Sequence, residues 1–215
     1  MTRTGIIVEL EELLFDTRDL RADALHAALL IEHVGVSRDD VLQAHAGVPA
    51  AIALARLDAA SALDDTAREL VLHRAADHVR RCFEEQMPSF DAVARDALQQ
   101  LAAEFALGVV TRAARADAVR LLQLAELDAY VAVVRSLDGL EADRHHETWS
   151  DVLMRLHASQ GVAIAPSELL HAARTAGLHT IAIDVPPRPA SGAPPWDGSL
   201  ASLARVNASF ITSLT

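Results

Sequence analysis

The chain has 215 residues, of which 51% are hydrophobic, and a formal net charge of −11 at pH 7. This length and composition predict a globular protein with one substantial core and a smaller subdomain. The acidic balance argues against nucleic acid or an anionic membrane as a partner, because both require a basic surface.

All 19 basic residues are arginine, so no side chain can form a Schiff base and any phosphate contact falls to arginine. Cys82 is the single cysteine and cannot form an internal disulfide, which favours a reduced, cytoplasmic location. No stretch has the roughly 20 apolar residues of a membrane-spanning helix, and the N-terminus does not resemble a signal peptide.

The first predicted element is a buried strand over the apolar run at residues 5–8. An acidic stretch follows it directly and contains Glu9, Glu11, Glu12 and Asp16. Ligands bind beyond the carboxyl ends of the strands in an open α/β sheet, so we expect these carboxylates to lie at a site.

A long helical stretch comes next, and nothing between residues 18 and 86 reads as a strand. The apolar spacing predicts helices over 18–35, 40–45, 49–60 and 65–85. We interpret this stretch as an inserted helical bundle.

The second half of the chain alternates between helix and strand. Predicted strands cover 105–110 (ending in Thr111), 130–134, 162–164 and 179–183; predicted helices cover 91–104, 113–124, 147–159, 167–176 and, weakly, 200–206; predicted loops cover 135–146 and 186–195. This alternation predicts an α/β fold with a Rossmann-like parallel sheet and helices on both faces. We place this core at 1–17 and 87–215, and a helical cap at 18–86.

The first strand and its acidic stretch resemble the first motif of the haloacid dehalogenase superfamily, an apolar strand followed by Asp-x-Asp-Gly-x-x-x-Asp-Thr. Glu9 and Glu11 stand at the two aspartate positions, and Asp16 and Thr17 match the end of the motif. The phrases at 87–90, 124–134 and 172–178 are similar to the capped phosphoglycolate phosphatase and β-phosphoglucomutase branch. Order and spacing agree from about residue 5 to 185, so the resemblance implies the capped core described above.

The resemblance also implies roles for these residues. Glu9 stands at the position of the phosphoryl-accepting nucleophile and Glu11 at that of the general acid and base, and both are candidate magnesium ligands. Each glutamate carries one more methylene than aspartate, and a misplacement of about 1 Å can cost on the order of a hundredfold in rate.

Three further positions follow from the same resemblance. Thr111 matches the hydroxyl that holds the phosphoryl group, and Arg144 is the best match for the cation that neutralises it. Ala165 stands where a magnesium-binding aspartate is expected, which predicts that Mg²⁺ binds weakly or not at all.

Each feature also has a plainer interpretation. The carboxylates after the first strand are then solvated charges, and Thr111 caps the helix that follows it. Arg144 and the two histidines after it are then an exposed polar loop, and Trp149 and Trp196 are packing residues.

Three functions stay open. The first is a degenerate, impaired or inactive phosphatase-like protein (a pseudoenzyme) that binds or regulates a phosphorylated small molecule or a protein partner. The second is a divergent magnesium-dependent small-molecule phosphatase that uses Glu9 and Glu11, and the third is a dehalogenase, which needs no metal. Magnesium on Glu9 and the Glu11 carbonyl would favour an enzyme, whereas a salt bridge from Glu9 to an arginine would favour a binding protein.

Overall fold

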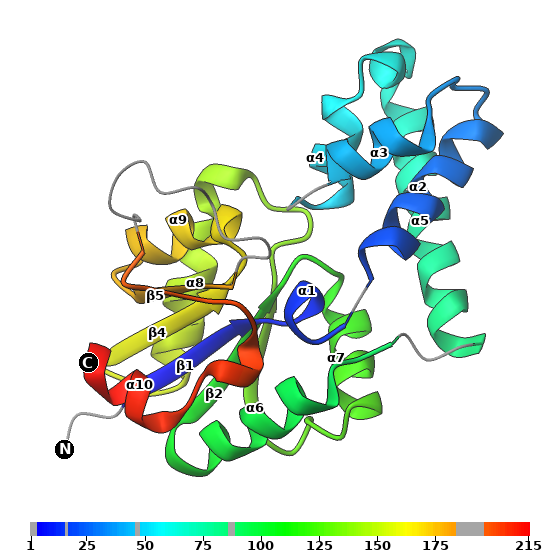
Figure 1. Cartoon of the computed structure of the whole chain (residues 1–215). Coiled ribbons are helices and arrows are strands. Elements are labelled where there is room, and N and C mark those ends of the chain that lie inside the picture. The colour runs from blue at the N-terminus through cyan, green and yellow to red at the C-terminus, as the bar shows by residue number, and fades with distance from the viewer. Residues whose placement is uncertain (1–3, 16, 46–47, 86–88, 184–195) are drawn as a thin grey trace. The chain divides into compact units, whose positions relative to one another are not determined.

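The computed structural model describes residues 4–15, 17–45, 48–85, 89–183 and 196–215. It divides into two compact units: a core unit, Met1–Phe15 with Phe90–Thr215, and a cap unit, Asp16–Ser89. The predicted boundaries lay between 17 and 18 and between 86 and 87. Figure 1 shows the elements of each unit.

The core unit is built on a six-stranded parallel sheet in the order β3-β2-β1-β4-β5-β6. The strands are β1 (Thr4–Glu9), β2 (Ala106–Thr111), β3 (Val131–Ser136), β4 (Gln160–Ala165), β5 (His179–Ile183) and β6 (Gly198–Leu200). Every residue of β2 and all but the first of β1 and β4 are buried, as expected for a parallel sheet covered on both faces. Chain order reverses between β1 and β4, the position at which such sheets bind ligands.

Helices cover both faces of this sheet (Figure 1). One face carries α6 (Ala92–Glu104) and α7 (Arg115–Leu124), and the other carries α8 (His145–Arg155) and α9 (Ser167–Thr175). The approach of α8 is close, because a Cβ added to Gly108 would lie 2.6 Å from Val152 Cγ1. The α/β fold class predicted from the sequence is therefore confirmed.

Among the described residues of the cap unit, every regular element is a helix or a 3₁₀ turn. Its elements are α2 (Arg18–Ile31), α3 (Arg38–His45), α4 (Ala50–Arg56), the 3₁₀ turn η1 (Asp58–Ala62) and α5 (Asp65–Glu85). α2 and α5 pack along each other, and the buried residues of α5 recur every four positions: Val71, Ala75, Val79 and Phe83.

Two predictions in the second half were wrong. The segment 135–146 is not a single loop: β3 runs to Ser136, η2 covers Ala142–Arg144, and α8 begins at His145. That helix ends at Arg155, short of the predicted 159, and His157 then adopts a left-handed backbone conformation with φ 51°.

The C-terminal prediction was also wrong. In place of a helix over 200–206, β6 ends at Leu200, η3 covers Leu203–Arg205 and α10 covers Ala208–Leu214. The Asn207 side chain accepts a hydrogen bond from Phe210 N and caps α10, a signal that was present in the sequence. The predicted loop at 186–195 lies outside the described residues, which resume at Trp196.

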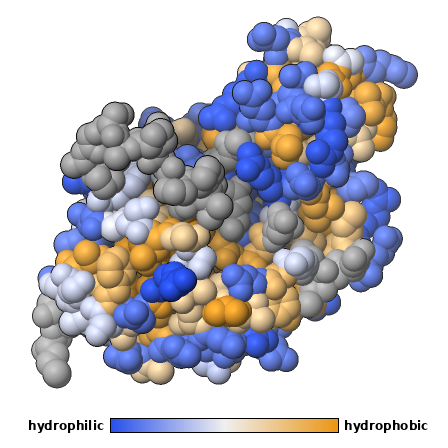
Figure 2. Space-filling model, in the orientation of Figure 1, coloured by the Kyte–Doolittle hydropathy of each residue, from blue (hydrophilic) through white to orange (hydrophobic). Residues whose placement is uncertain are grey.

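Within the described residues, none of the helices combines the length and the apolar character that crossing a bilayer would require. Figure 2 shows hydrophilic and hydrophobic residues interspersed over the visible face of the core unit.

Candidate functional site

Glu9 ends the central strand β1 and is completely buried. The strand register places Glu9 opposite Val110 of β2, and Val8 opposite Ile164 of β4. The carboxyl ends of three neighbouring strands therefore meet here, and they bring Glu9, Thr111 and Ala165 to the same edge of the sheet.

Arg112, which follows β2 directly, supplies a positive charge to this edge. Its Nε lies 3.8 Å from Glu9 Oε1, and the two side chains are 6% and 0% exposed. Two opposite charges this well buried interact more strongly than they would in water, and a guanidinium stays protonated at any physiological pH. Arg112 was not among the site residues predicted from the sequence, although its place directly after Thr111 was an available signal.

Glu11 begins the short helix α1 (Glu11–Leu14) and is also buried. Its backbone carbonyl, considered above as a magnesium ligand, accepts a hydrogen bond from Phe15 N at 2.8 Å. Thr17 is buried as well, whereas Asp16 lies outside the described residues.

Thr111 is held rigidly at the end of β2. Its hydroxyl oxygen accepts a hydrogen bond from Ala113 N at 3.1 Å, and its carbonyl accepts one from Leu137 N at 2.8 Å. The interpretation that Thr111 caps the following helix was wrong, because α7 begins only at Arg115 and has no side-chain cap. The hydroxyl closes the turn between strand and helix, and its role towards phosphate stays a prediction.

Ala165 ends β4 with its methyl group in the hydrophobic core, beside α9 residues such as Leu169. The next residues offer no buried carboxylate, since Pro166 precedes α9 and Glu168 is exposed. Across the part of the chain that the structure describes, no group of three His, Cys, Asp or Glu side chains is placed to hold a metal ion.

Arg144 lies in η2, before α8, with its side chain 58% exposed. It forms an ion pair with Glu147 at 2.9 Å, and the hydrogen bond from this guanidinium lowers the pKa of the Glu147 carboxyl. The exposed-loop interpretation of this segment was only partly right, because His145 starts α8 and is buried, and burial lowers its pKa. A role for Arg144 at a phosphate stays a prediction.

Both tryptophans pack, as the plainer interpretation expected. Trp149 is completely buried in the core, and Trp196 packs against the same cluster.

The sequence profile of the family described as "Haloacid dehalogenase-like hydrolase" matches residues 6–183. The chain belongs to this family. None of the curated proteins compared with the chain matches it.

Solved structures of this haloacid dehalogenase-like (HAD-like) type have the same fold at low sequence identity. CbbY from Rhodobacter sphaeroides, in complex with phosphate, is 16% identical, with 95% of this chain and 96% of that chain covered and a TM-score of 0.76. A putative phosphoglycolate phosphatase from Lactobacillus plantarum is 13% identical over 100% of both chains, with a TM-score of 0.76. A putative β-phosphoglucomutase from Thermotoga maritima is 18% identical, with 99% and 100% covered and a TM-score of 0.68. The resemblance to the capped HAD branch is thereby confirmed.

Proposed function

We propose that this HAD-like protein has a degenerate site that does not perform magnesium-dependent phosphoryl transfer, and that the protein acts by binding. The observation that carries this proposal is the buried ion pair between Glu9 and Arg112. It is the arginine contact that we expected of a binding protein and not of an enzyme.

The charge of Arg112 explains why this contact opposes the enzyme. A magnesium site needs several oxygen ligands in a strict octahedron, and a neighbouring guanidinium repels a divalent cation in a buried setting. With Arg112 3.8 Å from Glu9, the carboxylate already has a counter-charge. The same cation reduces the nucleophilic character of Glu9 towards a phosphorus atom.

The methyl group of Ala165 supports the same proposal. It occupies the end of β4, where the resemblance leads us to expect a magnesium-binding carboxylate, and it is packed among apolar side chains. On the β4 side of Glu9, an alanine therefore stands in place of the expected magnesium-binding carboxylate. On the β2 side, the guanidinium of Arg112 lies close to Glu9.

The ligand class follows by analogy, and we propose a phosphorylated small molecule. A variant of CbbY from Rhodobacter sphaeroides was solved in complex with xylulose-1,5-bisphosphate, and that protein has a TM-score of 0.77 and 16% identity to this chain. An active phosphatase is the alternative, favoured by the burial of Glu9, Glu11 and Thr111. A dehalogenase would need no metal, but it would need Glu9 to be a free nucleophile.

The test is hydrolysis of an aryl phosphate and of a panel of sugar phosphates by the purified protein, with and without Mg²⁺. The control is Glu9→Gln, which keeps the shape of the side chain and is checked for folding by circular dichroism. We expect the two proteins to give the same background rate. Magnesium-dependent turnover that Glu9→Gln abolishes would establish a phosphatase and reject the proposal.

A further inference from the structure

The strand β3 forms one edge of the core sheet, and in the described part of the chain it pairs only with β2. Of its six residues Val134 is buried, Ala132 is exposed and the other four are half-buried. The register with β2 passes from Val131 to Val133 across the step from Leu107 to Gly108, so Ala132 has no opposite residue. The edge is therefore irregular, partly exposed, and not paired with a further strand among the described residues.

A groove of about 530 Å³ lies along this edge, between the start of α7 and the end of α8. Its polar lining is basic and includes Arg115, Arg135, Arg155 and His157. Its apolar lining includes Met154, which is 65% exposed.

The arginines form a network in which positive charge is in excess. Asp151 accepts hydrogen bonds from Arg135 Nε at 2.6 Å and from Arg155 Nε at 2.9 Å. The hydrogen bond from Arg135 is the main cause of the lowered pKa of the Asp151 carboxyl. The guanidinium groups of Arg115, Arg135 and Arg155 and the carboxylate of Asp151 together carry a charge of +2. The net charge of the whole chain is −11.

The backbone of β3 presents hydrogen-bonding groups to the same groove. The carbonyl oxygen of Val134 accepts a bond from Arg115 Nε at 3.4 Å and from Arg135 Nη1 at 3.2 Å. This carbonyl is therefore directed away from β2, towards the position of an added strand. The two side-chain donors occupy the place that the N–H group of a partner strand would take, so an added strand has to displace them from this carbonyl.

The positive charge of the groove favours an acidic partner over a second copy of this chain. A second copy joined through its own β3 would bring two patches of charge +2 together, which is unfavourable. An extended acidic segment instead gains main-chain hydrogen bonds along the edge, ion pairs with the arginines, and an apolar contact with Met154.

We propose that the edge of β3 that does not pair with β2, together with its three arginines, binds an acidic polypeptide segment in extended conformation, by addition of a strand that displaces the arginine side chains from the Val134 carbonyl. This surface is separate from the Glu9 site, and the proposal does not depend on whether that site is active.

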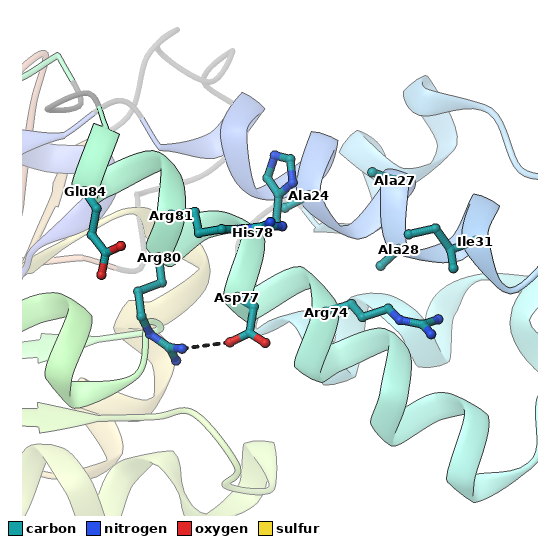
Figure 3. A pocket seen from close by; sticks show the side chains of 10 residues that line it. All are labelled: Ala24, Ala27, Ala28, Ile31, Arg74, Asp77, His78, Arg80, Arg81 and Glu84. Carbon is teal, nitrogen blue, oxygen red and sulfur yellow. Dashed lines mark hydrogen bonds and ion pairs between the residues drawn. The ribbon is translucent and has the colours of Figure 1, made fainter.

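The cap unit contains a groove that serves as a comparison. It lies between α2 and α5 and also contains three arginines, Arg74, Arg80 and Arg81, which Figure 3 shows with their neighbours. There the charges cancel, because Asp77 and Glu84 line the groove and Arg74 is paired with Glu32. Unlike the β3 groove, it has neither an excess of charge nor an open strand.

The experiment measures fluorescence anisotropy of a labelled peptide of alternating glutamate and valine, mixed with the full-length protein. We expect saturable binding that weakens as salt is added, and none for the peptide with lysine in place of glutamate. Arg155→Glu should weaken binding by about tenfold or more. The matched control is Arg80→Glu, because the two arginines have similar surroundings. Arg80 is 55% exposed and pairs with Asp77 at 2.7 Å, and Arg155 is 51% exposed and pairs with Asp151 at 2.9 Å.

Ala132→Pro separates strand addition from simple anion binding. Proline removes a backbone N–H group but is tolerated on an edge strand, so it should weaken peptide binding while the arginines stay in place. Binding that survives Ala132→Pro and is displaced by inorganic phosphate would mean an anion site and overturn the proposal. A dimer in sedimentation that Arg155→Glu strengthens, or no anisotropy change at all, would overturn it as well.

Discussion

Glu9 and Arg112 are buried charges that lie close enough to stabilise each other at the carboxyl ends of β1 and β2. Removing one partner of such a pair leaves a charge in a poorly solvated site, which costs more than the pair contributes. The contact between Glu9 and Arg112 therefore bears on the stability of the fold as well as on the function of the site.

We expect Arg112→Met to lower the free energy of unfolding by about 3 kcal/mol, because Glu9 then loses its buried counter-charge. Denaturant unfolding followed by circular dichroism measures the change. The double variant Glu9→Gln with Arg112→Met should lose less than the sum of the two single variants, since the neutral amide needs no counter-charge. Additive losses would show that the two side chains do not interact.

The sequence could suggest the carboxylates but not this contact. Glu9 is recognisable because it ends an apolar run, and Ala165 because it ends another. The proximity of Arg112 to Glu9 depends on the pairing of β1 with β2, whose residues are about a hundred positions apart in the chain.

At the scale of the elements, the pairing of β6 with β5 is accompanied by hydrogen bonds to Asp197. Its carboxylate accepts hydrogen bonds from Thr180 N at 2.7 Å and Thr180 Oγ1 at 3.0 Å, which tie the segment before β6 to β5. Burial raises the pKa of Asp197, but these hydrogen bonds, together with the nearby charges of His179 and Arg174, outweigh it and the pKa lies below its usual value.

This lowered pKa predicts a pH-dependent stability. A carboxylate whose pKa is lower in the folded state stabilises the protein above its unfolded pKa of about 3.9, and the contribution is lost as the pH falls through the folded value. We expect Asp197→Asn to be less stable than the wild type by about 1 kcal/mol near neutral pH. The difference, measured by thermal or denaturant unfolding, should shrink below about pH 4. A difference that is constant with pH would contradict this account.

Local patterns explain which elements were predicted correctly. The helix over 65–85 and the strand over 179–183 have the bounds that the sequence indicated, because four-residue apolar spacing and a β-branched run are visible within each segment. β6 has three residues and little apolar character, so its sequence did not indicate a strand, whereas in the structure it pairs with β5 and Asp197 binds Thr180.

At the scale of the whole molecule, the cap unit leaves and re-enters the core at adjacent points. Phe15 and Phe90 form an antiparallel bridge with ring centroids 6.0 Å apart, and Asp91 N donates to the carbonyl of Leu14 at 2.9 Å. The two points of the core unit between which the cap unit is inserted are therefore joined by contacts within the core unit itself.

We expect the core unit to fold without the cap when residues 16–89 are replaced by a Gly/Ser linker of about five residues, which is enough to connect two bridged positions. The measurement is urea unfolding followed by circular dichroism and by tryptophan fluorescence, since Trp149 lies in the core. One cooperative transition with both signals would support this expectation. A broad, non-coincident loss of the two signals would show that the core needs the cap to fold.

The sequence by itself determined the alternation of strands and helices and the position of the helical insertion, because both depend on periodicities within short segments. Tertiary structure alone decided that Arg112 lies beside Glu9, that Asp197 binds Thr180 and that Phe15 meets Phe90. These contacts join residues far apart in the chain, so they depend on strand register and helix packing, which local composition does not specify.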